Sequence, residues 1–200
     1  MAIAPSFCGV VLAAGESRDG RDKALLTYGG RTFLAGAIEA LRPHTDMVLV
    51  VVGRNAELLS PVVYAAGAFL VENPEPERGQ FGSLQAGLRE VLNRGRDAAI
   101  VMLVDRPPVA EATIAQLRQA FLHAAGRGRW AVVPEHNGKH GHPLVVGREM
   151  IEAFLQAPVN STAREVEHSL LDRIEYVAVS DPMVTFDVDS PEDDARRAAS

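Results

Sequence analysis

The stretch VVLAAGESRDGRDKALL, residues 10–26, holds the clearest clue to both the fold and a ligand. It opens as an apolar run of strand length, which breaks at Gly15, and Arg18, Arg21 and Lys23 then bring three positive charges together. A glycine lets the backbone approach a ligand closely, and successive loop N–H groups can point at phosphate oxygens. The stretch therefore predicts a buried strand followed by a loop that meets a small anion. The alternative is a solvated turn with ordinary surface charges.

Similar apolar runs recur along the chain and alternate with segments of helical period. MVLVVV (47–52) and AAIVMLV (98–104) are apolar at every position, as expected for central parallel strands covered by helices on both faces. Strands are expected at 7–13, 47–52, 68–72, 98–104, 130–134, 143–147 and 174–179, with a short piece near 184–187. Helices are expected at 32–41, 54–64, 81–93, 111–125, 148–156, 161–170 and 191–199. This alternation predicts a mostly parallel sheet in a single-domain, three-layer α/β/α fold spanning residues 1–200.

The composition is that of an ordinary globular protein of 200 residues, 47% of them apolar and 23% charged. The formal net charge of −6 argues against a nucleic-acid partner, because no basic stripe offsets phosphate repulsion. The single cysteine, Cys8, excludes a disulfide framework, and the first residues lack the cationic region of a signal peptide. The apolar runs are too short to span a bilayer. We therefore expect a cytoplasmic protein with no membrane partner.

Acidic residues follow two of the expected strands. Asp105 comes directly after AAIVMLV, and Asp187 and Asp189 alternate, so within a strand they would point the same way. Ligands of such sheets bind beyond the carboxyl ends of the strands, and Mg²⁺ prefers hard oxygen ligands. Asp105, with Asp187 or Asp189, is therefore a candidate magnesium site. The alternatives are a turn aspartate at 105 and, after Asp189, a helix start at Ser190.

Two further segments carry candidate ligand-binding residues. In ERGQFGSLQAGL (77–88), Gly79 and Gly82 flank a turn into a helix, and Ser83 lies near its start. The N–H groups there could take an anion or a base edge, or the segment is a plain helix start. EHNGKHGHPL (135–144) has three histidines, but their spacing matches no usual zinc pattern. Contact with substrate through His142, or a solvated loop, is the better interpretation.

Taken together, these segments resemble the MobA-like nucleotidyltransferases. The motifs that carry the resemblance occur in the family's order from about Val10 to Asp194: the loop of residues 12–23, the acid Asp105, GSLQAGL (82–88), GHP (141–143) and DVDSPED (187–193). The resemblance implies a Rossmann-like nucleotidyltransferase fold with CTP bound at the carboxyl edge of the sheet. It also implies that the phosphate of a molybdopterin-type cofactor attacks the α-phosphate of CTP and releases pyrophosphate. A molybdoenzyme or its insertion chaperone is the protein partner this implies.

The resemblance also implies roles for individual residues. Nucleotide binding falls to Leu12, Ala13, Ala14, Gly15, Glu16, Ser17, Lys23, Gly79, Gly82 and Ser83. Catalysis falls to Lys23, Arg18 and Asp105, Mg²⁺ to Asp105 and Asp189, and contact with the acceptor to His142. Ala14 stands where guanylyl-transferring relatives carry glycine, and its methyl group favours a pyrimidine over a purine.

The chain departs from the family pattern at three places. The loop from Leu12 to Lys23 is one residue shorter than L-A-A-G-x-S-x-R-M-G-x-x-K, and the helix-entry loop has Gly79-Gln80 followed by Gly82-Ser83. The segment NSTAR (160–164) lacks the acid of the family's G-D-x-G-A-R.

Three other functions stay open: transfer to another phosphorylated acceptor, a nucleotide-sugar glycosyltransferase, and a non-catalytic module that binds nucleotide or cofactor.

Overall fold

The computed structural model describes residues 5–15, 22–158 and 160–186. Its strands are β1 (Phe7–Leu12), β2 (Thr27–Tyr28), β3 (Arg31–Thr32), β4 (Met47–Val52), β5 (Phe69–Glu72), β6 (Ala98–Leu103), β7 (Ala131–His136), β8 (Lys139–His140), β9 (Leu144–Gly147) and β10 (Ile174–Ala178). Its α-helices are α1 (Phe33–Leu41), α2 (Ala56–Ala65), α3 (Gly79–Asn93), α4 (Glu111–Ala125), α5 (Arg148–Gln156) and α6 (Ala163–Ser169). Short 3-10 helices are η1 (Lys23–Leu25), η2 (Arg42–His44), η3 (Pro76–Arg78), η4 (Leu171–Arg173) and η5 (Pro182–Thr185).

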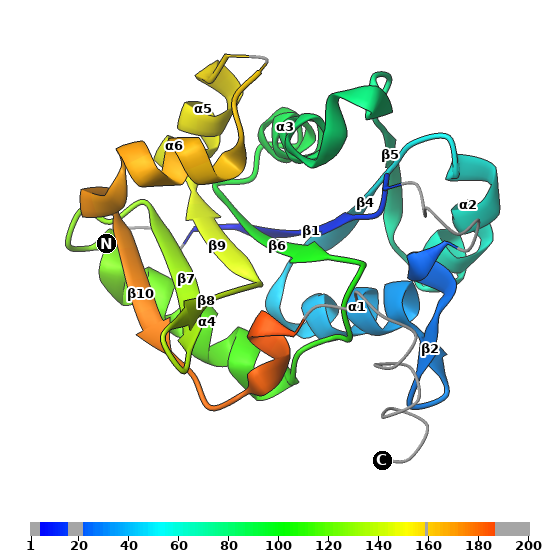
Figure 1. The fold of residues 1–200 in the computed structure, drawn as a ribbon, viewed down its shortest axis with the longest axis horizontal. Helices are drawn as coiled ribbons and strands as arrows, with labels where there is room; N and C mark the ends of the chain where they lie inside the picture. Colours follow the sequence, from blue (N-terminus) through cyan, green and yellow to red (C-terminus); the bar gives the residue numbers. More distant parts are fainter. Residues whose placement is uncertain (1–4, 16–21, 159, 187–200) are drawn as a thin grey trace.

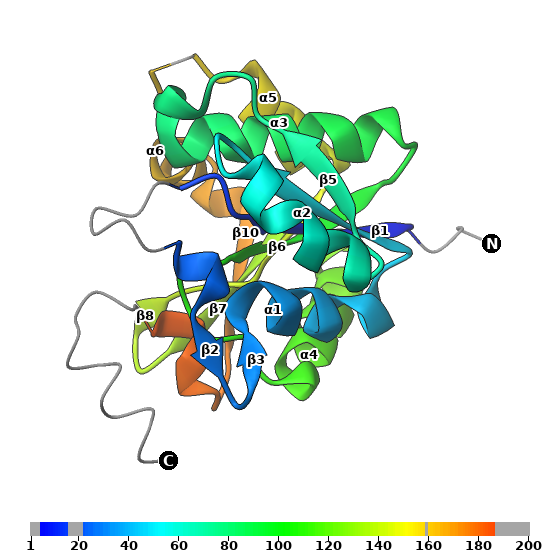
Figure 2. The ribbon, with the colours of Figure 1, turned by 90° about the vertical axis from the view of Figure 1, so that its right-hand side faces the viewer.

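One mixed sheet forms the middle layer of the molecule. Its strand order is β10-β7-β9-β6-β1-β4-β5, and β8 pairs with β7 outside that path. The helices α3, α5 and α6 cover one face and α1 and α4 the other, as Figures 1 and 2 show. The three-layer α/β/α arrangement predicted from the alternation of apolar runs is therefore confirmed.

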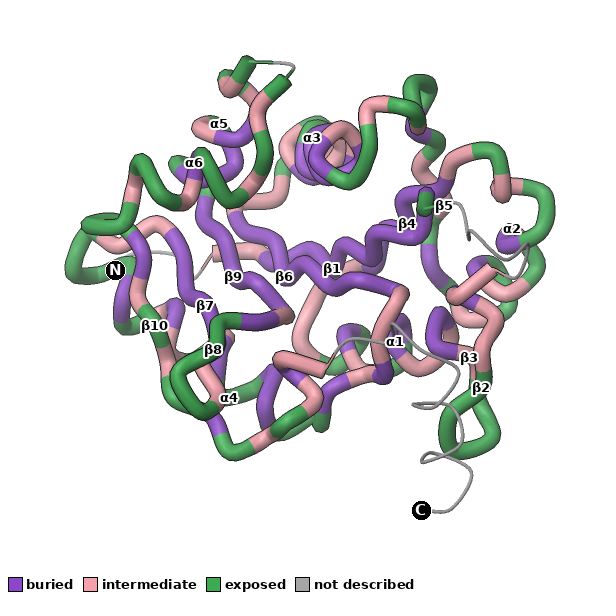
Figure 3. Tube along the Cα trace, viewed as in Figure 1, coloured by how far each residue is buried: buried purple, intermediate pink, exposed green. Residues whose placement is uncertain are grey.

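The central strands bury both of their faces. Along β1, Phe7 and Val11 belong to the core cluster shared with α1, α2 and α4, whereas Cys8, Val10 and Leu12 belong to the cluster shared with α3 and α5. Figure 3 shows buried residues running along β1 and β6 and, after the half-buried Met47, along β4. Since side chains alternate across a strand, both faces must be apolar when helices cover both. The uninterrupted apolar sequence of these strands follows from this burial.

Most neighbouring strands are parallel, but the strand β9, which lies between β6 and β7, runs in the opposite direction. The pairs β1–β4, β1–β6, β4–β5 and β7–β10 are parallel. β9, by contrast, is antiparallel to both β6 and β7. The predicted, mostly parallel sheet is confirmed.

Two elements expected near the end of the chain are not confirmed. The expected strand near 184–187 is wrong for its described residues, because Pro182–Thr185 form η5. The Asp181 side chain accepts a hydrogen bond from Met183 N and so starts this turn, and Pro182 provides no N–H for a strand ladder. The helix expected at 191–199 lies outside the described residues. In the described part, no helix is both long and apolar enough to cross a membrane.

Candidate active site

The parallel strands end in register, which brings the loops that follow them to one edge of the sheet. Leu12 pairs with Val51 of β4 and with Leu103 of β6. Residues two positions further on, Ala14 and Asp105, are therefore neighbours across the sheet edge. This is the place where ligands of open α/β sheets bind.

A cavity of about 420 Å³ lies at this edge. Its lining residues come from β1 and β6 with the segments that follow them, from the segment after β4, from the start of η1, from η3 and from the start of α3: Leu12, Ala14, Gly15, Asp22, Lys23, Arg54, Pro76, Glu77, Gly79, Gln80, Ser83, Leu103, Val104 and Asp105. The structure thus gathers seven of the predicted site residues around one cavity. Glu16, Ser17, Arg18 and Asp189 lie outside the described residues.

The first loop is held where it leaves β1 and where it enters η1. Asp22 caps η1 by accepting a hydrogen bond from Ala24 N at 2.9 Å, so Lys23 occupies the first position of that turn. Asn55, from the segment after β4, donates from Nδ2 to Ala13 O at 2.8 Å and to Asp22 Oδ2 at 2.6 Å. Sequence reasoning missed Asn55, because nothing in the local pattern ties it to residues 33 and 42 positions away.

The helix α3 points its N-terminus at the cavity. It begins at Gly79, whose φ of +74° is one that glycine adopts without strain. The free N–H groups and the dipole of such a helix start favour an anion. Ser83 is buried, and its hydroxyl accepts a hydrogen bond from Asn73 Nδ2 at 3.1 Å and donates to Gly79 O at 3.3 Å.

Gly82 has a different place from the one expected. The helix starts two residues earlier than predicted, so Gly82 lies inside its first turn and does not flank a loop. A Cβ at this position would come within 2.9 Å of Arg78 Cβ. The glycine therefore permits close packing at the helix start.

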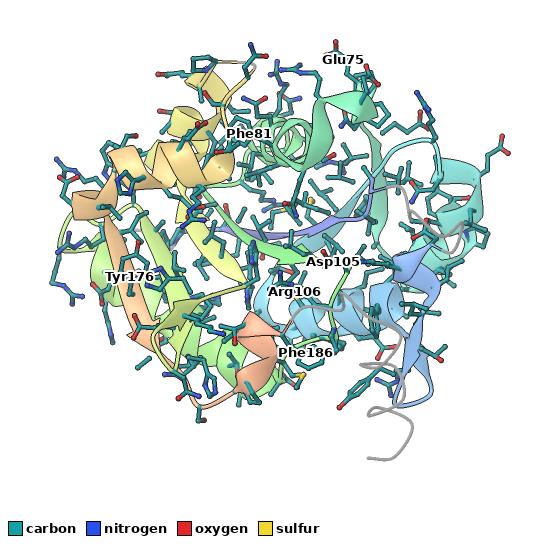
Figure 4. All side chains as sticks on the ribbon, viewed as in Figure 1. Glu75, Phe81, Asp105, Arg106, Tyr176 and Phe186 are labelled. Atoms are coloured by element: carbon teal, nitrogen blue, oxygen red, sulfur yellow. The ribbon has the colours of Figure 1, made fainter. Side chains whose placement is uncertain are left out.

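Asp105 lies directly beyond β6 and faces the cavity. Its Oδ1 is buried and accepts no hydrogen bond from the described residues, although Arg106 Nε lies 3.5 Å away. Figure 4 shows the two side chains beside each other. A carboxylate oxygen with spare acceptor capacity suits a divalent cation. Within the described residues, no three His, Cys, Asp or Glu side chains converge as a metal cluster.

His142 lines a second, larger cavity of about 1290 Å³ that adjoins the first. Leu12, Glu77, Gly79, Gln80 and Leu103 border both cavities. Burial, with the nearby Arg106 charge, lowers the pKa of His142 to about 3, so its imidazole is neutral at pH 7. His142 N donates to Val184 O at 2.9 Å, which joins this segment to η5.

The histidines of segment 135–144 have separate partners. His136 Nδ1 lies 2.9 Å from Val179 O, and the His140 ring stacks on Tyr176 with 3.9 Å between centroids.

Ionisable side chains also line the second cavity. Lys139, Arg164, Glu167 and His168 contribute to it, together with Tyr176. Burial raises the pKa of Glu167 to about 7, against the opposing effect of the Arg164 charge. The NSTAR segment also borders this cavity, and Thr162 forms a capping box with Glu165 at the start of α6.

Comparison with known proteins shows a nucleotidyltransferase family over most of the chain. Residues 9–174 match the model of the MobA-like NTP transferase domain. The chain is 26% identical over 187 residues to the molybdenum cofactor cytidylyltransferase of Escherichia coli strain K12, covering 92% of this chain and 91% of that protein. It is 30% identical over 151 residues, 74% of this chain, to the bifunctional protein GlmU of Agrobacterium fabrum. The chain spans only 32% of the length of that relative.

The fold also matches a solved structure from end to end. The crystal structure of Rv0371c from Mycobacterium tuberculosis H37Rv is similar with a TM-score of 0.82 and 27% identity, covering 100% of both chains. A complex of Rv0371c with manganese is similar with a TM-score of 0.78 and 26% identity, covering 98% of this chain and 99% of the other. The metal in that complex fits the expectation of a divalent cation.

Proposed function

This chain belongs to the MobA-like NTP transferase family, and we propose that it transfers CMP from CTP to the phosphate of a molybdopterin-type cofactor. The observation that carries the proposal is the pair of adjoining cavities. The first is lined by Lys23, Asp105 and the start of α3, and the second by His142. Two substrates that react with each other need two binding sites with a common border. The residues that line both cavities form such a border.

In this proposal an oxygen of the acceptor phosphate attacks the α-phosphorus of CTP. The new P–O bond forms while the bond between the α-phosphorus and the oxygen that bridges it to the β-phosphorus breaks. Pyrophosphate leaves with the electron pair of that broken bond. Such a transfer depends mainly on alignment and on neutralising phosphate charge. Lys23 and the N-terminus of α3 supply fixed positive charge to the triphosphate. His142, being neutral, can touch the acceptor without adding charge to it.

Asp105 and Asp189 are the residues we propose to hold Mg²⁺. The Oδ1 of Asp105 is buried and accepts no hydrogen bond from the described residues, and this supports the first of these assignments. A divalent cation bound there would neutralise charge on the phosphate oxygens. The finished cofactor would pass to a molybdoenzyme or its insertion chaperone.

A pyrophosphate-release assay tests this function and separates it from its alternatives. The assay combines the protein and Mg²⁺ with CTP or GTP, and with molybdopterin-type cofactor, a sugar phosphate or no acceptor. We expect release only with CTP and the cofactor. Release with the sugar phosphate alone would assign transfer to another phosphorylated acceptor. Nucleotide binding without any release would indicate a non-catalytic module.

A further inference from the structure

We propose that Asn55 is a positioning residue that ties the two ends of the first loop together and thereby sets Lys23 against the triphosphate. The inference rests on the proposed function, because it assumes that a nucleotide triphosphate binds beside Lys23. Asn55 does not itself line the cavity, whereas Asp22 and Lys23 do.

The Asn55 amide uses both of its donors on this connection. Both protons of Nδ2 have acceptors, since Ala13 O and Asp22 Oδ2 lie at 2.8 and 2.6 Å. The amide oxygen accepts from Gly53 N at 3.0 Å, which fixes the side chain to the end of β4. An amide with two donors and an acceptor suits this place better than a carboxylate, which can only accept when ionised.

Asn55 does not cap its helix through its side chain, although that is the usual role of an asparagine at this position. Asn55 is the N-cap of α2, where an asparagine commonly accepts from an N–H of the first helical turn. Here the side chain makes no such bond to its own helix. The amide oxygen, which could accept from the first turn of α2, accepts from Gly53 N instead, and in this orientation Nδ2 donates to both ends of the loop, which points to a function at the loop.

Asp22 carries the effect from Asn55 to Lys23. Its Oδ1 caps η1 through Ala24 N, and its Oδ2 accepts from Asn55. One carboxylate therefore connects the β4 segment to the turn on which Lys23 stands. Loss of the Asn55 amide would free Asp22 to rotate, and Lys23 would lose its fixed position relative to Ala13.

The test measures CTP and GTP binding calorimetrically with Mg²⁺ for the full chain and two variants. We expect Asn55→Ala to weaken binding of the preferred nucleotide about tenfold, as the loss of one or two hydrogen bonds predicts. Asn55→Asp places a carboxylate against Asp22 and should weaken binding at least as much at about pH 8. At about pH 5.5 a proton shared by the two carboxyl groups restores a donor, so Asn55→Asp should bind severalfold better than Asn55→Ala.

Asn93→Asp is the matched control, because Asn93 Nδ2 also lies near a carboxylate, Glu90 Oε2 at 3.3 Å, but at the far end of α3. This variant should bind like the original chain at both pH values.

Three results would overturn the inference. The first is that Asn55→Ala binds nucleotide as tightly as the original chain, and the second is that Asn55→Asp matches Asn55→Ala at both pH values. Either outcome removes the positioning role and leaves the proposed function standing. If the original chain binds neither nucleotide, the proposed function fails and the inference falls with it. Thermal unfolding of every variant checks that the fold is kept.

Discussion

Asp105 and Asp172 each form an ion pair with the arginine that follows in the chain, but only Asp105 faces the cavity. The distances are 3.5 Å from Asp105 Oδ1 to Arg106 Nε and 3.2 Å from Asp172 Oδ2 to Arg173 Nε. Asp105→Asn removes a charge that would hold a cation, so turnover should fall by about a hundredfold or more, roughly 3 kcal/mol in the barrier. Asp172→Asn makes the same change on the exposed surface and should leave pyrophosphate release unchanged. Equal loss in both variants would refute the assignment of Asp105.

Ala14 is the residue at which we expect the choice of base to be made. It is 8% exposed and lines the first cavity, and it packs close to Gly53, where a Cβ would come 3.2 Å from Ala14 O. We expect the Ala14 methyl group to take space that a purine needs more than a pyrimidine does. A contact of this size is worth about 1–3 kcal/mol.

Ala14→Gly should therefore narrow the difference between CTP and GTP. The measurement is the rise in melting temperature at equal concentrations of each nucleotide with Mg²⁺. In the original chain CTP should give the larger rise. The idea fails if GTP stabilises the original chain as well as CTP does.

At the scale of elements, α3 owes its close approach to the sheet to Gly87. A Cβ there would lie 2.8 Å from Val51 Cγ2 and 2.9 Å from Val10 Cγ1. Gly87→Ala should destabilise the fold by about 1–3 kcal/mol, since β1 and β4 lie rigidly in the core. This corresponds to a fall of roughly 3–10 °C in Tm for a chain of this size.

Gly126→Ala is the matched control for that change. Gly126 ends α4 with φ of −62°, and a Cβ there would lie 3.5 Å from His123 O, which is an ordinary contact. Its Tm should stay close to that of the original chain. A smaller effect at Gly87 than at Gly126 would mean that α3 can move away from the sheet at little cost.

Sequence patterns predicted the strands and helices whose buried faces give a regular apolar pattern. β1, β4 and β6 bury both faces, so their residues are apolar throughout, and the helices α4 and α5 match their predicted bounds. β2 and β3 were missed because they are two-residue strands, largely exposed, with no alternation to detect. The direction of β9 could not be predicted either, since LVVG is equally apolar when run either way.

Residues of the candidate site could be predicted only where the pattern that marks them lies within one segment of the sequence. Asp105 after β6 and Lys23 after a glycine-containing loop are local patterns, and the structure places both at one cavity. Asn55 acts through partners far away in the sequence, and the position of Gly82 depended on a helix start two residues from the expected one. Such features follow from tertiary contacts, which local sequence does not encode.

At the scale of the whole molecule, Glu167 and His142 make stability depend on pH in opposite ways. The pKa of Glu167 is raised to about 7 in the folded chain from 4.5, so its contribution to stability is full below pH 4.5 and is lost as the pH rises to about 7. The pKa of His142 is lowered to about 3 from 6.5, so its contribution is full above pH 6.5 and is lost as the pH falls. Between about pH 4.5 and 6.5 the two slopes oppose each other.

The difference in unfolding free energy between each variant and the original chain should therefore isolate the slope that the replaced residue contributes. With Glu167→Gln, the difference in unfolding free energy from the original chain should grow as the pH rises from about 4.5 to 7, favouring the variant by about 1–3 kcal/mol at the upper end. With His142→Gln, the variant should gain relative to the original chain as the pH falls below about 6.5, because the unfolded state no longer takes up that proton. Urea unfolding at a series of pH values measures both differences, and subtracting the original chain removes the contribution of the other carboxylates. A flat difference curve for Glu167→Gln would show that this side chain is as well solvated in the folded chain as in the unfolded one.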